Sequence, residues 1–406
     1  MTHIARALSA ALAAIVLAAG CQQLPAPAER AAACPPCAPC PECPPAKPPP
    51  PTARYEPAQL SALPGWQSAT LAPSLRAFVT GCAKIAPRSP LRSTCDAARA
   101  VPLDDESAAR RFFESAFSAH SIRAGDGSAE GLVTGYYEPI LAGSRVRTEK
   151  ARFPVYGVPD DLVVVDLAAL HPELNSLRLR GRIEGRRLVP YWSRAEIEER
   201  SREIGGGSGF EARVLAWVQD PVELFFLQIQ GSGQIQLESG ERIRLGYADQ
   251  NGHPYRSIGR QLVERGELKL EQASMQGIKG WALANPEKLT ELLNWNSSYV
   301  FFREIDSSDG PIGALGVPLS AGYSIAVDAR FVPLGAPVFL ATTEPLSTRP
   351  LERLMVAQDT GGAIRGPVRA DFYWGTGDAA GALAGRMRQP GRMWLLWPSA
   401  EKLGSE

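Results

Sequence analysis

The sequence predicts a mainly β fold of the α+β class, and three observations lead to it. Beyond residue 57, short apolar runs alternate with Gly, Pro and Asn turn signals. Only a few segments have apolar residues at helical spacing. The chain has 406 residues, of which 45% are hydrophobic, so it can form one large or two ordinary cores. Short strands with scattered helices are typical of barrel-like β domains.

The first residues predict a targeting signal rather than a folded element. Arg6 supplies a positive charge, Ala7–Ala19 form a short apolar run, and small residues lead directly to Cys21. The run is too short to span a bilayer. Residues 1–20 resemble a bacterial lipoprotein signal, after which Cys21 would be lipidated; an ordinary cleaved secretory signal is the alternative. The lipoprotein interpretation implies attachment to the outer membrane, facing the periplasm.

Residues 21–57 predict an extended linker. Of the 35 prolines in the chain, 13 lie between Gln22 and Pro57, where large apolar residues are almost absent. In a polyproline II rod, residues three apart share one face. This spacing holds for Cys34, Cys37, Cys40 and Cys43. Disulfides between neighbouring chains, or a simple spacer, are favoured over a metal site, because the prolines keep the thiolates from converging on one ion.

Hydrophobic periodicity predicts the elements of the folded part. Helical spacing occurs at Ser107–His120, Ile258–Arg265 and Pro286–Asn294. The remaining apolar runs predict strands. These strands are Leu132–Tyr137, Asp161–Leu167, Leu188–Tyr191, Val222–Ile229, Gln234–Leu237, Arg242–Tyr247, Ser324–Val327, Val338–Leu340, Leu354–Gln358 and Met393–Leu396. In the same part of the chain, Cys82 and Cys95 predict a disulfide, with two free buried thiols as the alternative.

Charge and histidine content argue against two classes of function. The 43 basic side chains balance 43 acidic ones, so no nucleic-acid partner is expected. The chain has four histidines, and none belongs to an HExxH pair or to a Cys/His cluster of zinc spacing. No metal site is therefore expected.

Carboxylates at strand ends are the candidates for chemistry. Asp328, Asp359 and Asp371 each lie at or near the end of a predicted apolar strand. Burial raises the pKa of such a carboxyl, as a general acid near neutral pH requires. The alternative is that each Asp caps a turn. Aromatic residues able to stack on sugar rings favour a carbohydrate groove, and they are Tyr136, Tyr137 and Trp374.

Several long segments carry a family resemblance. They are TGYYEP, LQIQGSG, GYADQNGHPYRSIGR, NSSYVFFRE, GVPLSAGYSIAVDARFVPLGAPVFL and AQDTGGAIRG followed by RADFYWG. In this order they resemble the membrane-bound lytic murein transglycosylase A family, over about Ala58 to Pro398. One departure is Ser297, where the family usually has Pro.

The resemblance implies a two-domain fold. A double-psi β-barrel would contain an inserted smaller β-barrel domain, with a groove between them that holds a glycan strand. We expect residues 58–140 and 240–400 to form the larger domain and residues 141–239 to form the insert.

The resemblance also implies a reaction and its residues. Asp371 would cleave the β-1,4 bond between N-acetylmuramic acid and N-acetylglucosamine, acting as acid and then base, with a 1,6-anhydromuramoyl end as product and no cofactor. Asp328 and Asp359 would support it. Expected substrate-binding residues are Thr134, Gly135, Tyr136, Tyr137, Gln230, Gly231, Ser232, Gly233, Gly361, Gly362 and Trp374. Expected partners are peptidoglycan glycan strands, the outer membrane and cell-wall synthase or hydrolase complexes.

Two other functions stay open from the sequence. A glycoside hydrolase would use a second carboxylate, for which Asp359 and Glu138 are the candidates. A non-catalytic lipoprotein would only tether a partner to murein. The products separate the three functions, since a hydrolase leaves reducing ends and a tether leaves no product.

Overall fold

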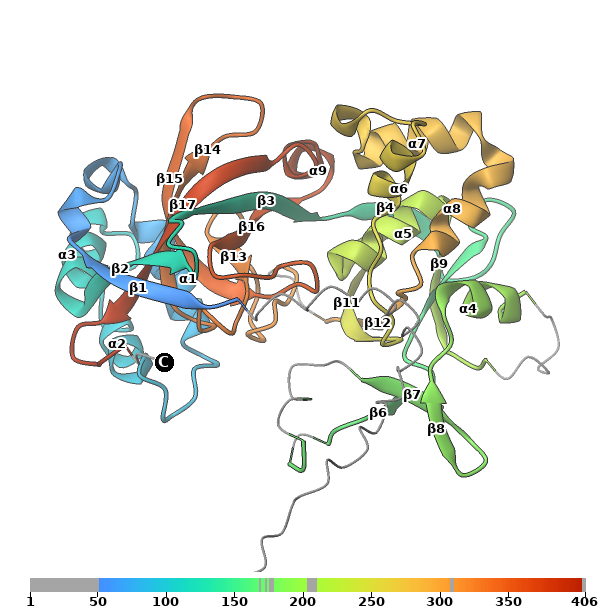
Figure 1. Ribbon diagram of the computed structural model, residues 1–406, viewed down its shortest axis with the longest axis horizontal. Coiled ribbons are helices and arrows are strands. Elements are labelled where there is room, and N and C mark those ends of the chain that lie inside the picture. The colour runs from blue at the N-terminus through green and yellow to red at the C-terminus, as the bar shows by residue number, and fades with distance from the viewer. Residues whose placement is uncertain are drawn as a thin grey trace, which may run out of the picture. The chain divides into compact units, whose positions relative to one another are not determined.

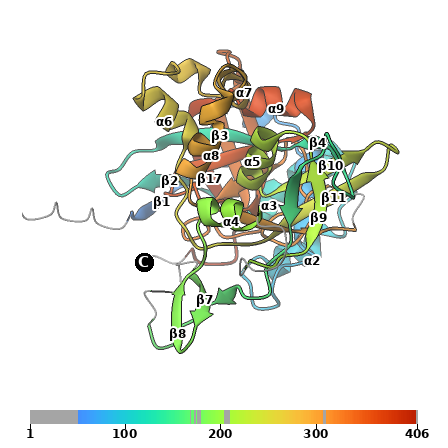
Figure 2. The same ribbon diagram turned by 90° about the vertical axis from the view of Figure 1, so that its right-hand side faces the viewer.

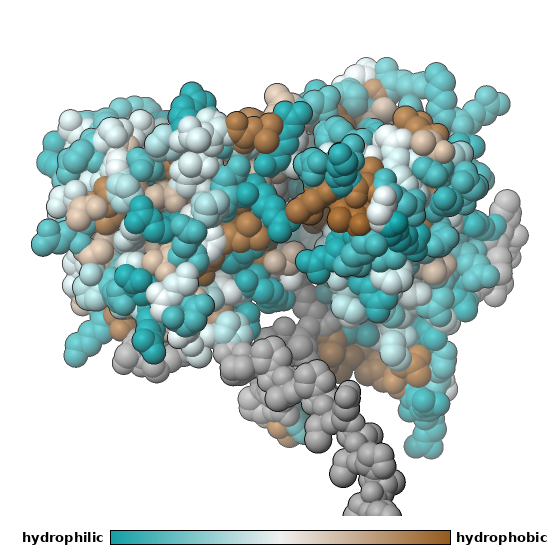
Figure 3. Space-filling model, turned by 45° about the horizontal axis from the view of Figure 1, so that its top comes forward, coloured by the Kyte–Doolittle hydropathy of each residue, from teal (hydrophilic) through white to brown (hydrophobic). Residues whose placement is uncertain are grey.

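The computed structural model describes residues 51–167, 169–171, 174, 179–202, 210–306 and 310–403. The predicted signal, Cys21 and the predicted linker up to residue 50 lie outside the described residues. The linker prediction is wrong for residues 53–57, which belong to a strand that pairs with residues 119–124. No helix in the described ranges is both long and apolar enough to cross a membrane. The face drawn in Figure 3 is mostly hydrophilic, with its hydrophobic residues in separate patches.

An eight-stranded sheet is the first of the three sheets formed by the described residues (Figure 1). Its strand order is β1-β2-β17-β14-β15-β13-β16-β3, and β3 also pairs with β17, so six of these strands close into a ring. The double-psi crossing expected from the resemblance stays a prediction. The strands are β1 (Ala53–Ala58), β2 (Phe117–Ala124), β3 (Glu130–Glu138), β13 (Ser324–Val327), β14 (Pro337–Thr343), β15 (Pro350–Asp359), β16 (Arg369–Thr376) and β17 (Arg388–Pro398).

Helices α1 (Ala72–Gly81), α2 (Arg92–Ala98), α3 (Glu106–Ala116) and α9 (Asp378–Ala384) accompany this sheet. Apolar side chains from α1, α3 and the strands form one continuous core, which includes Phe78, Phe113 and Phe339. The predicted disulfide between Cys82 and Cys95 is present and joins the end of α1 to α2.

A second sheet has its own core. Its strand order is β12-β11-β10-β4-β9-β5, and Leu141, Ile235 and Phe302 are buried within it. The strands are β4 (Ile140–Ser144), β5 (Phe153–Tyr156), β9 (Val214–Val218), β10 (Ser232–Leu237), β11 (Arg242–Gln250) and β12 (Val300–Glu304).

Helices and a small sheet accompany the second sheet (Figure 2). The small sheet consists of β6 (Val163–Val164), β7 (Arg180–Glu184) and β8 (Arg187–Pro190). The helices are α4 (Arg194–Arg200), α5 (Pro221–Gln230), α6 (Ile258–Glu264), α7 (Met275–Ala284) and α8 (Leu289–Trp295).

The second sheet extends further along the chain than the expected insert of residues 141–239. β11 pairs with β10, and β12 pairs with β11, so the sheet continues to Glu304. Helices α6, α7 and α8 pack with α5 in a shared apolar cluster. Residues 240–304 therefore belong with the insert, and the chain returns to the eight-stranded sheet at β13. Turn signals around residue 239 mark only the hairpin between β10 and β11.

The predicted strand Val222–Ile229 is wrong, because this segment forms α5. Asp220 accepts hydrogen bonds from the backbone N–H groups of Val222 and Glu223, which caps the helix start. Gly231 ends the helix with φ 76°. The helix lies between two cores, since Leu227 packs in one and Phe225 in the other. Burial on two sides removes the helical periodicity from the sequence.

The predicted helix Ser107–His120 also needs a correction. Helix α3 ends at Ala116, and Phe117–Ala124 forms β2 instead. Asp105 caps the helix start by accepting from the N–H of Ala108. The other two predicted helices are confirmed as α6 and, after a 3-10 turn at Pro286–Lys288, α8.

Candidate active site

Two of the predicted aspartates lie in one row across the eight-stranded sheet. Ala326 of β13 pairs with Asp359 of β15 on one side and with Asp371 of β16 on the other. Asp371 in turn pairs with Thr134 of β3. Residues directly opposite one another on neighbouring strands share a face of the sheet. The aspartates and Thr134 therefore lie on one face, opposite the face that carries the main core.

Asp371 is held by a short chain of polar groups. The Thr134 hydroxyl donates a hydrogen bond to Asp371 Oδ1 at 2.5 Å, and Arg369 Nη2 donates to Thr134 Oγ1 at 2.9 Å. Protein atoms surround the Asp371 carboxyl, although the residue keeps some solvent exposure. Burial raises the pKa of Asp371, and the Thr134 bond and Arg369 charge offset only part of this rise. The site thus favours a protonated carboxyl with a fixed orientation.

Asp359 is a second carboxyl with a raised pKa. Burial raises its pKa to about 6, although backbone N–H groups of Ala314 and Thr360, each 2.9 Å from Oδ1, oppose the shift. Tyr136 lies beside it, and burial followed by the charges of Asp359 and Asp371 raises the pKa of the Tyr136 hydroxyl. The two groups influence each other electrostatically, but this hydroxyl has no hydrogen-bond partner of ordinary geometry in the described residues.

The raised pKa makes the stability of the protein depend on Asp359 and on pH. Its pKa rises from 3.8 to about 6 on folding, so its ionisation destabilises the folded state as pH rises through this interval. Asp359→Asn cannot ionise, and we expect it to gain on the order of 1–2 kcal/mol relative to the parent chain between pH 4 and pH 7. Denaturant unfolding at both pH values measures this difference.

Asp328→Asn provides the matched control for this experiment. Burial alone would raise the pKa of Asp328, but hydrogen bonds from Arg330 and Gly366 outweigh it and lower the pKa. The stability from this carboxylate is therefore present above its unfolded pKa and lost as pH falls. We expect the deficit of Asp328→Asn to grow as pH rises, opposite in sign to the Asp359 effect. A constant effect of Asp359→Asn at both pH values would contradict the raised pKa.

Asp328 lies apart from the other two aspartates. It follows β13, and its carboxylate accepts from Arg330 Nη2 at 2.6 Å and from the Gly366 N–H at 2.8 Å. Gly366 belongs to the loop between β15 and β16. Asp328 thus fixes this loop, which connects the strands of Asp359 and Asp371.

The predicted aromatic residues divide between the two faces of the sheet. Tyr136 packs against Tyr373, with ring centroids 5.2 Å apart, on the face of Asp371. Trp374 instead packs on Phe372 at 4.6 Å and donates from Nε1 to Met387 Sδ at 3.3 Å. Tyr137 packs against α9, near Trp374. The structure therefore brings Tyr136 to Asp371 but places Trp374 and Tyr137 on the other face.

The predicted glycines have different surroundings. A Cβ at Gly135 would lie 2.7 Å from Trp374 Nε1 and 2.9 Å from the Cα of Ala384, so this glycine permits close packing of α9. A Cβ at Gly233 would lie 2.3 Å from Leu227 Cδ1. Gly361 and Gly362 lie in the loop after Asp359, where Gly362 is exposed. Of these four, only the last two border the candidate site.

The QGSG segment meets β3 near its end. Gln230 Oε1 accepts a hydrogen bond from the Tyr137 N–H at 3.2 Å. Gly231 caps α5, and Ser232 begins β10 opposite Gly246. This segment is therefore tied to β3 three residues beyond Thr134.

Glu138 is buried; its Oε2 accepts two hydrogen bonds, while its Oε1 has an arginine nearby but no hydrogen bond within the described residues. Its Oε2 accepts from Gln234 Nε2 at 2.8 Å and from the Thr376 hydroxyl at 2.7 Å, and Arg244 Nε lies 3.4 Å from Oε1. The side chain is 0% exposed. It therefore links β3 and β16 to β10 and β11 and has no open side on which to activate a water molecule.

Two residues of the site are not among those predicted from the sequence. Arg369 and Tyr373 flank Asp371 at two positions before and after it, so strand alternation places them on its face. This spacing of two residues from Asp371 is the feature of the sequence that could have identified both residues as part of the site. Because Arg369 bonds to Thr134, the polar chain around Asp371 includes a cation.

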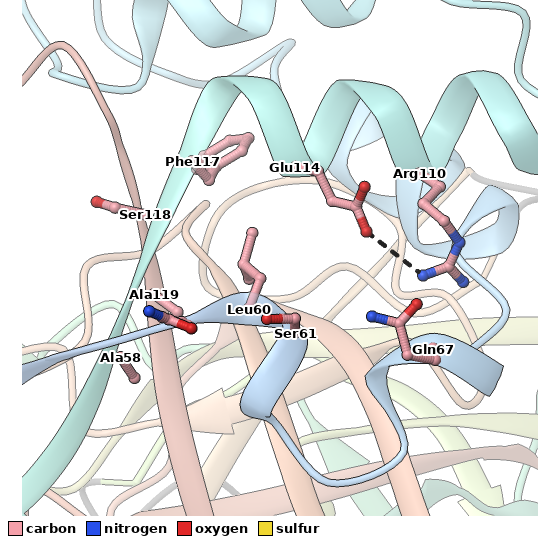
Figure 4. Close-up of a pocket in the computed structure, with 10 residues that line it drawn as sticks. Ala58, Leu60, Ser61, Gln67, Arg110, Glu114, Phe117, Ser118 and Ala119 are labelled. Carbon is pink, nitrogen blue, oxygen red and sulfur yellow. Dashed lines mark ion pairs between the residues drawn. The ribbon is translucent and has the colours of Figure 1, made fainter.

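A cavity of about 560 Å³ lies between α3, β2 and residues 58–67, away from Asp371 in the order of paired strands (Figure 4). Its Arg110 lies 3.8 Å from Glu114 and donates to the carbonyls of Trp66 and Ala69. The residues that line it include none of the predicted site residues. Within the described ranges, no cluster of three or more His, Cys, Asp or Glu side chains could hold a metal ion.

Comparisons with known proteins agree with this architecture. The MltA specific insert domain family matches residues 132–303, and the 3D domain family matches residues 323–397. The first match ends close to Glu304, where the six-stranded sheet ends.

Three relatives are informative. The membrane-bound lytic murein transglycosylase A of Escherichia coli K12 is 34% identical over 271 residues, which cover 65% of this chain and 64% of the relative, slightly less than two thirds. The crystal structure of MltA from Neisseria gonorrhoeae, in its monoclinic form, is 44% identical with a TM-score of 0.75, covering 86% of this chain and 94% of that chain.

The crystal structure of E. coli MltA with bound chitohexaose is 28% identical with a TM-score of 0.61, covering 81% of this chain and 90% of that chain. The two family matches together extend over the six-stranded sheet and over the strands that carry Asp359 and Asp371. The chain belongs to the membrane-bound lytic murein transglycosylase A family.

Proposed function

We propose that this protein is a lytic transglycosylase that cleaves peptidoglycan glycan strands, with Asp371 as its catalytic residue. The observation that carries the proposal is the partly buried Asp371 carboxyl, which the Thr134 hydroxyl orients and whose pKa is raised. The names of the relatives support a murein substrate, and the chitohexaose bound to the E. coli protein supports an oligosaccharide site.

The reaction needs one carboxyl in two successive roles. Protonated Asp371 gives its proton to the glycosidic oxygen between N-acetylmuramic acid and N-acetylglucosamine, and the bond to the anomeric carbon breaks. The Asp371 carboxylate then takes the proton from the C6 hydroxyl of the same muramoyl residue, whose oxygen attacks the anomeric carbon. A 1,6-anhydro ring results, and because the nucleophile belongs to the substrate, no activated water is needed.

The neighbours of Asp371 support both roles. Thr134 occupies Oδ1 as a donor, which leaves Oδ2 to carry the transferred proton. The Arg369 charge stabilises the carboxylate after it gives up the proton. Asp359 would act indirectly. Its charge would change the electrostatic potential at Asp371, and its backbone hydrogen bonds would position the loop that contains Gly361 and Gly362. Gln230 and Ser232 would contact N-acetyl groups of the strand from the edge of the second sheet.

The protein would act from a lipid anchor at Cys21 on the periplasmic face of the outer membrane. Some thirty linker residues at roughly 3 Å each would let the enzyme reach the murein layer. Cell-wall synthases or hydrolases remain its proposed protein partners.

Product analysis tests the proposed function. The full chain is incubated with purified murein, and the soluble products are identified by mass spectrometry. We expect muropeptides with 1,6-anhydromuramoyl ends, which are lighter by one water molecule than hydrolytic products. Products with reducing ends would show hydrolysis instead, and binding to murein without product would leave only a tethering role.

A further inference from the structure

An arginine on the strand next to Thr134 continues the row of site residues. Arg388 of β17 pairs with Thr134 of β3, which pairs with Asp371 of β16. Residues paired in this way share a face of the sheet, so Arg388 starts from the same face as the Asp371 carboxyl. Two strand spacings separate the two backbones, which amounts to roughly 10 Å. A side chain as long as arginine can reach a sugar residue bound over Asp371.

The Arg388 side chain has no polar partner among the described residues. It is exposed, and no hydrogen bond or ion pair joins its guanidinium to another residue in the described part of the chain. Arg369, by contrast, is held by Thr134 and by the carbonyls of Leu132 and Ala370. Among the described residues, Arg388 is therefore a cation of this face, two strands from Asp371, whose guanidinium is available to a ligand.

The charges of this face favour an anionic ligand. Burial raises the pKa of both carboxyls, that of Asp359 to about 6, so each carries less negative charge near neutral pH than an ordinary carboxyl would. Guanidinium groups stay charged at all physiological pH values, so Arg369 and Arg388 add positive charge to this face. An arginine fork recognises a carboxylate through charge-assisted hydrogen bonds.

We propose that Arg388 selects glycan strands by binding a carboxylate of the muramoyl residue next to the scissile bond. The proposal rests on the function proposed above. In a glycan strand only the muramoyl residues carry a carboxylate, either directly on the lactyl group or at the end of an attached peptide. Recognition of that group fixes which sugar lies on each side of Asp371, so the cleaved bond follows a muramoyl residue and not an N-acetylglucosamine residue.

Binding measurements separate this proposal from catalysis. The full chain carrying Asp371→Asn is titrated calorimetrically with three tetrasaccharides of alternating N-acetylglucosamine and N-acetylmuramic acid. The first has free lactyl carboxylates, the second has these converted to neutral methylamides, and the third carries peptides on its lactyl groups. We expect at least one carboxylate-bearing ligand to bind roughly tenfold more tightly than the methylamide.

The Arg388 variants then identify the residue responsible. Arg388→Ala should abolish this preference and Arg388→Lys should keep part of it. Arg392→Ala is the matched control, because Arg392 lies on the same strand and face, roughly 13 Å along, and stacks on Trp394. It should retain the full preference. If Arg388→Ala loses the preference for the ligand with free lactyl groups, Arg388 binds the lactyl carboxylate. If it loses the preference for the ligand with attached peptides, Arg388 binds the peptide carboxylate.

Three results would overturn the proposal. They are an equal affinity of the Asp371→Asn chain for all three ligands, a preference that survives Arg388→Ala, and a preference that Arg392→Ala removes as fully as Arg388→Ala does. Failure of the proposed function gives a different result, because the chain with Asp371 intact would then release no anhydro products, whatever the binding preference.

Discussion

Replacing Asp371 with Asn is expected to slow the release of anhydromuropeptides from murein by about three to four orders of magnitude. Asn has the shape of a protonated carboxyl and can accept the Thr134 hydrogen bond, so the site keeps its geometry. It can neither give nor take a proton, so both proposed steps lose their catalyst. The rate is measured by mass spectrometry of soluble products, and thermal unfolding of the variant confirms that the fold is intact.

Asp359→Asn is the control for this result. Asp359 shares the face of Asp371 and also has a raised pKa, but backbone N–H groups of Ala314 and Thr360 hold its Oδ1. We expect this variant to lose about tenfold or less, through the altered field at Asp371. If both variants lose activity equally, two carboxyls share the chemistry, as in a hydrolase. If Asp371→Asn keeps most of the parental rate, the catalytic residue lies elsewhere.

Strand alternation accounts for what the sequence could predict of the site. Ser324–Val327 is a strand with the predicted bounds, and the predicted strand Leu354–Gln358 lies within β15, which ends at Asp359. The same alternation separates Trp374 from Asp371, because residues three apart on one strand point to opposite faces. Applied consistently to the sequence, it assigns Trp374 to the core side and Arg369 to the site.

Long-range pairing accounts for what the sequence could not predict. Asp328, Asp359 and Asp371 look equivalent along the chain, since each lies near the end of an apolar strand. Only the pairing of β13 with both β15 and β16 shows that Ala326, and not Asp328, lies between the other two. The extent of the insert depends in the same way on β12, which pairs with β11 although residues 251–299 separate the two strands along the chain.

Replacing Glu138 with Ala is expected to lower the free energy of unfolding by about 3–5 kcal/mol, because the change leaves Arg244 without its anion in a mostly buried position. Gln234 and Thr376 also lose their acceptor. These partners come from both sheets, so the loss weakens the junction where β3 ends and β4 begins. Denaturant unfolding of the variant beside the parent chain measures the effect.

A double variant decides whether the ion pair causes the loss. Removing both partners avoids the unpaired charge, so Glu138→Ala with Arg244→Ala should cost less than the sum of the two single changes. Additive losses would mean that packing, not charge, stabilises the junction. The folded fraction of Glu138→Ala should still release anhydro products, since Glu138 has no open side toward a substrate. Complete inactivation of well-folded protein would instead assign Glu138 to the chemistry and restore the two-carboxylate hydrolase as the better description.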